Sequence, residues 1–280
     1  MKRFRLVLMI LFLAAALIIV GVSMFGGAKT PEEILTAVLK NMDEIGSMRF
    51  QMNLGMEVSV LEQAVSLHSS VDGELTANPA VVHATVKTEM SGAQPTETEV
   101  YLETAGNETV TYMETGMGSW TAQRTQTSPE LASGAAGVLK LATVFAETEP
   151  EAVSETECVL TGEIPANKVV LALQATGMLL QLQTAELLDR SALEEMTEYL
   201  EAIPVRILVD TEKRLITGYE LDLTGTMRAI LTAAVQTGLD EAGLNFSARN
   251  VLDVTQVTAG VRFSAFDEVE EIVIPEFVKK

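Results

Sequence analysis

The stretch from residue 47 to residue 60 reads Ser-Met-Arg-Phe-Gln-Met-Asn-Leu-Gly-Met-Glu-Val-Ser-Val, with an apolar side chain at every second position. This strict period of two predicts a β-strand, because successive side chains of a strand point to opposite faces. One face of the strand is therefore apolar and the other is polar. Such a pattern is typical of an antiparallel sheet with one solvated side.

Downstream of this strand the alternation continues, less strictly, through five shorter stretches. The breaks between them carry turn chemistry, as in Asn78-Pro79 and Ser91-Gly92. Short breaks favour pairing between consecutive strands, so the sequence predicts an antiparallel meander of six strands. The five further strands are expected at residues 65–75, 81–90, 96–103, 109–113 and 119–125.

Upstream of the strand, a helix is expected to begin at Thr30-Pro31. Thr30 is a suitable N-cap, Pro31 suits the first helical position, and the two glutamates that follow complement the helix dipole. Apolar residues then recur at helical spacing over residues 34–42, and Gly46 is expected to end the helix. A capped amphipathic helix therefore leads into the long strand.

The rest of the chain mixes helices with a few strands. Residues 204–210 and 215–223 flank a four-residue loop, which predicts a second hairpin. Strands do not alternate regularly with helices, so the prediction is an α+β fold with one antiparallel sheet and helices on one side. Helices are expected at 128–145, at 165–188, at 191–202 and from 227 to Gly238 or Gly243, and strands at 157–163, 251–266 and 272–275.

The N-terminus carries an export signature. Lys2, Arg3 and Arg5 precede an uncharged apolar run over residues 6–25, and such an arrangement directs export. The run is longer than the core of a cleaved signal and close to the length that spans a bilayer, so a cleaved signal peptide and an uncleaved anchor both fit. Residues 1–28 are assigned to this leader or anchor. Residues 29–280 are expected to form an extracytoplasmic domain, either tethered to the cell membrane or secreted.

The charge of the chain excludes one class of partner. Beyond the leader, 16 Lys and Arg residues stand against 39 Asp and Glu residues. An acidic surface repels nucleic acid and anionic headgroups, because binding either depends on neutralising phosphates. No nucleic-acid partner is therefore expected.

Few residues offer chemistry. Cys158 is the single cysteine, so no internal disulfide can form, and a small buried hydrophobe is expected there. His68 and His83 fall in the polar phase of neighbouring predicted strands, where surface positions are expected, and two histidines lack the third protein ligand of a catalytic zinc site. Because no nucleophile, carboxylate pair or phosphate-binding loop has a recognisable pattern, we expect no enzymatic activity, no metal and no cofactor.

A likeness to a known fold is carried by residues 34–42 leading into 50–60, by 100–102 through 112 to 118–120, by 205–210 with 215–222, and by 263–276. Together these segments resemble the LolA/LppX-like fold of exported lipid-carrier and lipoprotein-sorting proteins, a layout shared by Gram-positive surface proteins of uncharacterised function. The likeness covers about residues 30–277. It implies a curved antiparallel sheet, or half-barrel, with helices packed on its concave side and an apolar face that can hold acyl chains. Val22 stands where a lipoprotein would carry its cysteine, so the N-terminal helix is the expected tether.

The apolar face of the opening strand is the candidate binding surface. Its methionines suit adaptable binding surfaces as well as irregular core packing, so two interpretations stay open: a lipid-sized pocket and an ordinary core. The first makes the chain a non-enzymatic surface protein that binds a lipid or acyl chain in a half-barrel cavity. The second makes it a structural or protein-interaction domain with a solid core. The candidate ligand-lining residues are Met48, Phe50, Met52, Leu54, Met56 and Val58.

Overall fold

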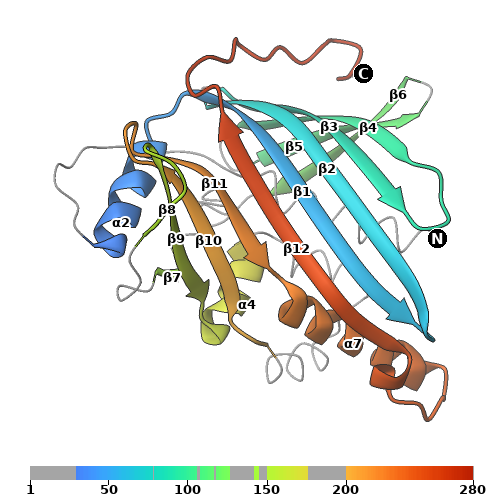
Figure 1. Cartoon of the computed structure of the whole chain (residues 1–280). Helices are drawn as coiled ribbons and strands as arrows, with labels where there is room; N and C mark the ends of the chain where they lie inside the picture. The colour runs from blue at the N-terminus through green and yellow to red at the C-terminus, as the bar shows by residue number, and fades with distance from the viewer. Residues whose placement is uncertain are drawn as a thin grey trace.

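A computed structural model describes residues 30–77, 79–105, 108–116, 118–126, 142–144, 150–175 and 200–279. Its main feature is an open, curved, antiparallel sheet of twelve strands, to which a few helices are added (Figure 1). The strands are β1 (Ser47–Val60), β2 (Gln63–Ala77), β3 (Ala80–Met90), β4 (Thr96–Ala105), β5 (Glu108–Gly116), β6 (Ser119–Gln126), β7 (Thr143–Val144), β8 (Glu151–Ala152), β9 (Glu157–Ile164), β10 (Ile203–Asp210), β11 (Leu215–Asp222) and β12 (Leu252–Ser264).

The strand order explains how the two halves of the chain make one sheet. It runs β6-β5-β4-β3-β2-β1-β12-β11-β10-β9-β7, and β8 pairs with β9. The predicted six-strand meander and the β10–β11 hairpin are confirmed. The two halves join where the first strand pairs with the last, with Phe50 opposite Phe263 and Met52 opposite Val261.

Helix α2 (Pro31–Met42) begins as the sequence predicts. The Thr30 hydroxyl accepts a hydrogen bond from the Glu33 amide at 3.3 Å, and the Glu33 carboxylate accepts one from the Thr30 amide at 3.2 Å. These reciprocal bonds form a capping box and satisfy amides that a helix start leaves free. The predicted end is wrong, because the helix stops at Met42 and four residues lead from there through Gly46 to β1.

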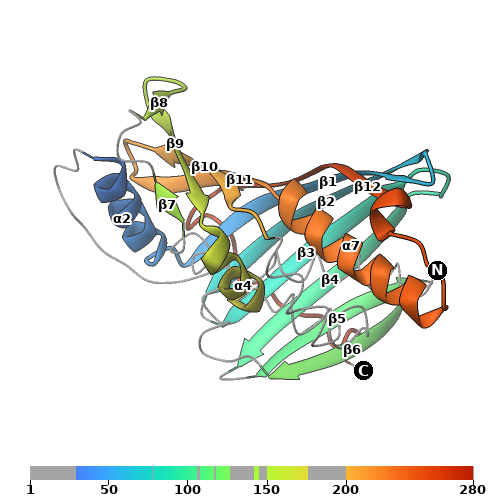
Figure 2. The same ribbon diagram turned by 90° about the horizontal axis from the view of Figure 1, so that it is seen from below.

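Helices α2, α4 (Ala166–Ala175) and α7 (Thr224–Glu241) lie on one face of the sheet (Figure 2). This face, called the inner face below, carries the apolar residues of β1. Helix α7 packs along β12, and α2 packs on β11. The expected end of α7 is confirmed, since Gly243 follows its cap with a φ of +67°, a conformation that favours glycine.

Two predicted helices fall largely outside the described residues. The described part of the first, 128–145, contradicts the prediction, because Thr143 and Val144 pair with β9 as a short strand. The second predicted helix spans residues 191–202, and its described residues, Leu200 to Ala202, are not helical.

Two predicted strands are confirmed. The strand expected at 157–163 is β9, and the long strand expected from residue 251 is β12.

The C-terminal segment after β12 corrects another prediction. Residues 272–275 alternate in polarity and were expected to form a strand, yet residues 268–275 have no regular structure. Ile274 is 7% exposed and Val273 is 74% exposed, so the alternation is real. The buried Ile274 packs on side chains of the outer face of the sheet, including Val81 and Tyr101, but the segment forms no strand pairing.

Candidate functional site

The six candidate residues of β1 all lie on the inner face and are all buried. Each exposes 8% or less of its surface, while the residues between them are mostly exposed. The structure therefore confirms the two-faced strand. The exposed fractions are 1% for Met48, 4% for Phe50, 7% for Met52, 8% for Leu54, 6% for Met56 and 8% for Val58.

These six side chains belong to one apolar core that extends from α2 to α7. Met56 lies opposite Leu67 of β2 and Val257 of β12, and Met227 and Ile230 of α7 belong to the same core. Phe50 covers Gly73 so closely that a Cβ at that position would collide with its ring. This part of the inner face is thus filled by the protein's own side chains.

The inner face continues beyond this packed part onto the far strands of the meander. Val86 and Met90 of β3 lie against the edge of the core and are half-buried. Val100 of β4 and Met113 of β5 face each other across the ladder and are also half-buried. We call these four residues the wing. Sequence reasoning missed the wing as a separate region, although its alternation was visible, because local periodicity does not tell which apolar residues remain accessible.

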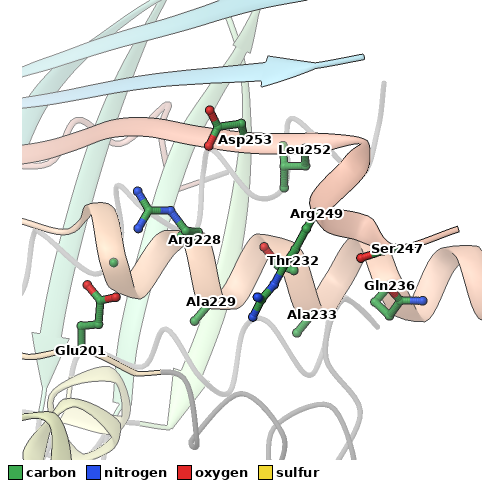
Figure 3. Close-up of a pocket in the computed structure, with 11 residues that line it drawn as sticks. Glu201, Arg228, Ala229, Thr232, Ala233, Gln236, Ser247, Arg249, Leu252 and Asp253 are labelled. Carbon is green, nitrogen blue, oxygen red and sulfur yellow. The ribbon is translucent and has the colours of Figure 1, made fainter. Parts of the chain in front are cut away.

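A cavity of about 720 Å³ lies beside α7 (Figure 3). Its wall on the helix is built from small side chains such as Ala229 and Ala233, which leave room next to the backbone. None of the six candidate residues of β1 lines it. The described lining residues are Glu201, Gly225, Arg228, Ala229, Thr232, Ala233, Gln236, Ser247, Arg249, Leu252 and Asp253.

Hydrogen bonds fix the walls of this cavity. Arg228 donates to the carbonyl of Val254 at 3.0 Å, which ties α7 to β12. The side-chain oxygen of Gln236 accepts from the Ala248 amide at 2.9 Å, and its nitrogen donates to the Phe246 carbonyl at 3.3 Å. One glutamine therefore holds the connection between α7 and β12 in a defined shape.

A second cavity, of about 560 Å³, separates α2 from the short strand β7. Leu35 and Leu39 give it an apolar wall, whereas Glu32, Lys40 and Asp43 make its rim charged. The candidate residues of β1 do not line this cavity either.

The histidines do not meet. His68 lies opposite Glu89, and His83 lies opposite Glu74, so the ladder separates the two imidazoles. His68 is exposed, as expected, whereas His83 is half-buried. The Nε2 atom of His83 lies 2.8 Å from a carboxylate oxygen of Glu99, which also accepts from the Tyr101 hydroxyl at 3.1 Å. Within the described ranges, no three His, Cys, Asp or Glu side chains are grouped as metal ligands.

The surroundings raise the pKa of several groups, among them Tyr101, Cys158 and Tyr219, whose ring is buried. Burial, assisted by the hydrogen bond to Glu99, raises the pKa of Tyr101 to about 12. Burial, with a smaller contribution from Glu157, also raises the pKa of the Cys158 thiol. Cys158 is 8% exposed and belongs to the core, which confirms the prediction of a buried hydrophobe.

The N-terminal leader or anchor, residues 1–28, lies outside the described residues. Among the helices that the structure does describe, none combines the length and apolar character needed to cross a bilayer.

Comparison with known proteins gives one match. Residues 30–148 match the model of DUF6612, a family of unknown function. The matched stretch begins with α2, contains the whole β1–β6 meander and covers less than half of the chain. No curated protein and no solved structure matches the chain.

Proposed function

We propose that this chain is a non-enzymatic extracytoplasmic protein whose domain binds a lipid or another apolar ligand. In this proposal residues 6–25 either anchor the protein in the cell membrane or are removed with the leader. The domain is a half-barrel of the LolA/LppX-like type, with its helices on the concave side. The ligand lies on that side, over the wing, and the six residues of β1 form the packed base beside it.

One observation carries the proposal: the apolar inner face does not end where the packed core ends. Val100 and Met113 continue it over two more strands and remain half-buried. Apolar side chains that remain partly accessible beside a packed core are what an acyl chain needs, because burying both surfaces is favourable. A curved sheet lets one ligand contact several strands at once.

Native mass spectrometry of protein purified from membranes without delipidation tests the proposal. We expect a lipid adduct and displacement of a fluorescent fatty acid by added lipid. The double substitution Val100→Glu and Met113→Glu places two carboxylates on the inner face and should weaken probe binding at least tenfold.

Ala122→Glu is the matched control for these variants. Ala122 is exposed and lies opposite Tyr112, on the outer face, so a carboxylate there should leave probe binding unchanged. Protein that carries no adduct and ignores the probe would refute the proposal. Equal loss of binding in both variants would refute the location on the inner face.

A second function, a structural or protein-interaction domain, is favoured by a different observation. All six residues that the sequence offered as ligand contacts are already buried by the protein itself. Under this alternative the wing is only the margin of the core. The same experiment separates the two, since a solid-core domain gives neither an adduct nor a probe signal.

A further inference from the structure

Two connections at the same end of the molecule expose large apolar side chains. Val60 and Leu61 lie at the turn between β1 and β2 and are 38% and 68% exposed. Leu244 and Phe246, in the connection from α7 to β12, are 46% and 60% exposed. Both connections lie at the right-hand end in Figures 1 and 2. We call these four residues the apolar end.

The opposite end of the sheet is largely polar, although Val153 of the β8–β9 connection also lies there. The β10–β11 connection there consists of exposed residues 211–214, which read Thr-Glu-Lys-Arg, and Glu44 lies between α2 and β1. Among the described residues, the other large apolar side chains with comparable exposure are Val153, Val273 and Phe277. Four of seven such side chains therefore gather at one end.

The backbone at Leu61 strengthens the argument. Leu61 and Glu62 form a two-residue turn with φ angles of +50° and +66°. Asn and Gly are the favoured residues in such turns, because a bulky side chain is strained at positive φ. An exposed leucine in this position serves neither packing nor turn formation, which fits a role for its side chain at the surface.

Both tips are held in place by hydrogen bonds. The Leu61 amide donates to the carbonyl of Val251 at 2.8 Å, which links the hairpin to the other connection. The Gln236 side chain bonds the backbone on either side of Ser247, as described above, so Phe246 sits on an ordered loop. The apolar side chains are thus presented to solvent by a fixed backbone.

The dimensions and charges of the apolar end indicate what it contacts. Four partly exposed side chains on two tips offer on the order of a few hundred Å² of apolar surface, whereas a stable protein interface takes about 800 Å² from each partner. Protruding apolar tips suit the headgroup–acyl boundary of a bilayer. In the part of the chain that the structure describes, the exposed charges beside the apolar end are the acids Glu62, Asp240 and Asp253 and the cation Arg249. The acids outnumber the cation, so a zwitterionic bilayer surface is favoured over an anionic one.

We infer that the apolar end docks onto a membrane surface rich in zwitterionic lipid, with Leu61 and Phe246 inserted below the headgroups. This is a property of the outside of the domain and does not depend on a ligand on the inner face. The docking is driven by apolar burial, so its strength is insensitive to salt and falls when anionic lipid is added.

Tryptophan quenching in the full-length protein tests the inference. The full chain carrying Phe246→Trp is reconstituted into vesicles of brominated phosphatidylcholine, with native Trp120 as constant background. Its fluorescence should be quenched at least twofold more than that of the matched control Val153→Trp, because Val153 is 54% exposed, close to the 60% of Phe246, but lies between β8 and β9 at the opposite end of the sheet. The extra quenching should persist in high salt.

A second variant keeps the test independent of folding. Leu61→Asn suits the positive φ of the turn and should not lower thermal stability, yet it should remove most of the extra quenching at position 246. It should also leave any lipid adduct in native mass spectra unchanged. The two measurements therefore distinguish a failure of membrane docking from a failure of the proposed ligand binding. Equal quenching at positions 246 and 153, quenching that disappears in high salt, or burial of the apolar end in a dimer would overturn the inference.

Discussion

The two faces of strand β1 are stabilised in different ways. On the inner face, β1 buries an unbroken row of apolar side chains beneath helices. On the outer face, its polar side chains pair across the ladder, with Arg49 2.7 Å from Glu74 and Gln51 2.8 Å from Asp72. The first arrangement supplies most of the stability, whereas exposed ion pairs contribute little.

The outer face is not polar throughout. Over β3 to β6 it carries a second, smaller apolar cluster that includes Val81, Tyr101 and Val110, and the C-terminal segment covers it with Ile274 and Val278. Helices cover one face and an irregular segment covers the other. Apolar side chains on either face of a sheet must therefore be covered from water. The covering segment can do this as a helix or without regular secondary structure.

The largest effect is expected from Phe50→Ala. It removes a ring that is 4% exposed and leaves a cavity over Gly73, so the free energy of unfolding should fall by about 3–5 kcal/mol. Urea titration followed by circular dichroism measures this. The neighbouring variant Arg49→Ala, on the outer face of the same strand, should change it by less than about 0.5 kcal/mol. Similar losses in the two variants would refute the contrast between the faces.

Gly73→Ala should come next. The added Cβ would collide with the Phe50 ring, which is already packed, so the strands must shift and about 1–3 kcal/mol of stability should be lost. The double variant Gly73→Ala with Phe50→Leu should recover part of this loss, because the smaller side chain leaves space. Without recovery in that double variant, the ring contact is not the cause.

A smaller and local effect is expected from Ile274→Ser on the outer face. The change should release the C-terminal segment at a cost of about 2 kcal/mol while the sheet stays folded. Because Phe277 packs edge-on against Trp120 with ring centroids 6.5 Å apart, the fluorescence of Trp120 should change. Val273→Ser, at a position 74% exposed, is the control and should leave the fluorescence as it is.

The smallest effect concerns alkaline pH. The pKa of Tyr101 is raised from 10.0 to about 12 by burial and by Glu99. A raised pKa means that the folded state keeps a proton that the unfolded state loses, so this contribution to stability is complete below pH 10 and disappears as the pH rises toward 12. Absorbance at the tyrosinate band should lose one late titration in Tyr101→Phe, while the late titration of Tyr219, whose pKa is also raised by burial, should remain. A titration near 10 in its place would contradict the burial of this ring.

Local patterns predicted most of the elements. Thr30 and Glu33 have the spacing of a capping box, and the period of two located β1 to within a residue, because both signals depend on neighbours in the sequence. The pairing of β1 with β12 had no such signal. Segments about two hundred residues apart share a register that is set by matching apolar faces in three dimensions, as with Phe50 and Phe263.

The candidate site shows the same limit. The sequence placed Met48 to Val58 on one apolar face, and the structure agrees. Periodicity could not tell whether that face is filled or open, because the answer depends on Leu67, Val257 and other residues that approach from elsewhere in the chain. The apolar end escaped prediction for a different reason: Leu61 and Glu62 lack the usual residues of a tight turn.

The union of the first and last strands has a consequence for how the molecule forms. Until residues 252–264 are available, β1 has no neighbour on one side, and its backbone groups there are unsatisfied. Contacts that span most of a chain close slowly, because the loop entropy is lost before they are gained. The domain therefore completes its sheet only after residues 252–264 have been synthesised, and until then the unpaired edge of β1 is open to pairing with other unfinished copies.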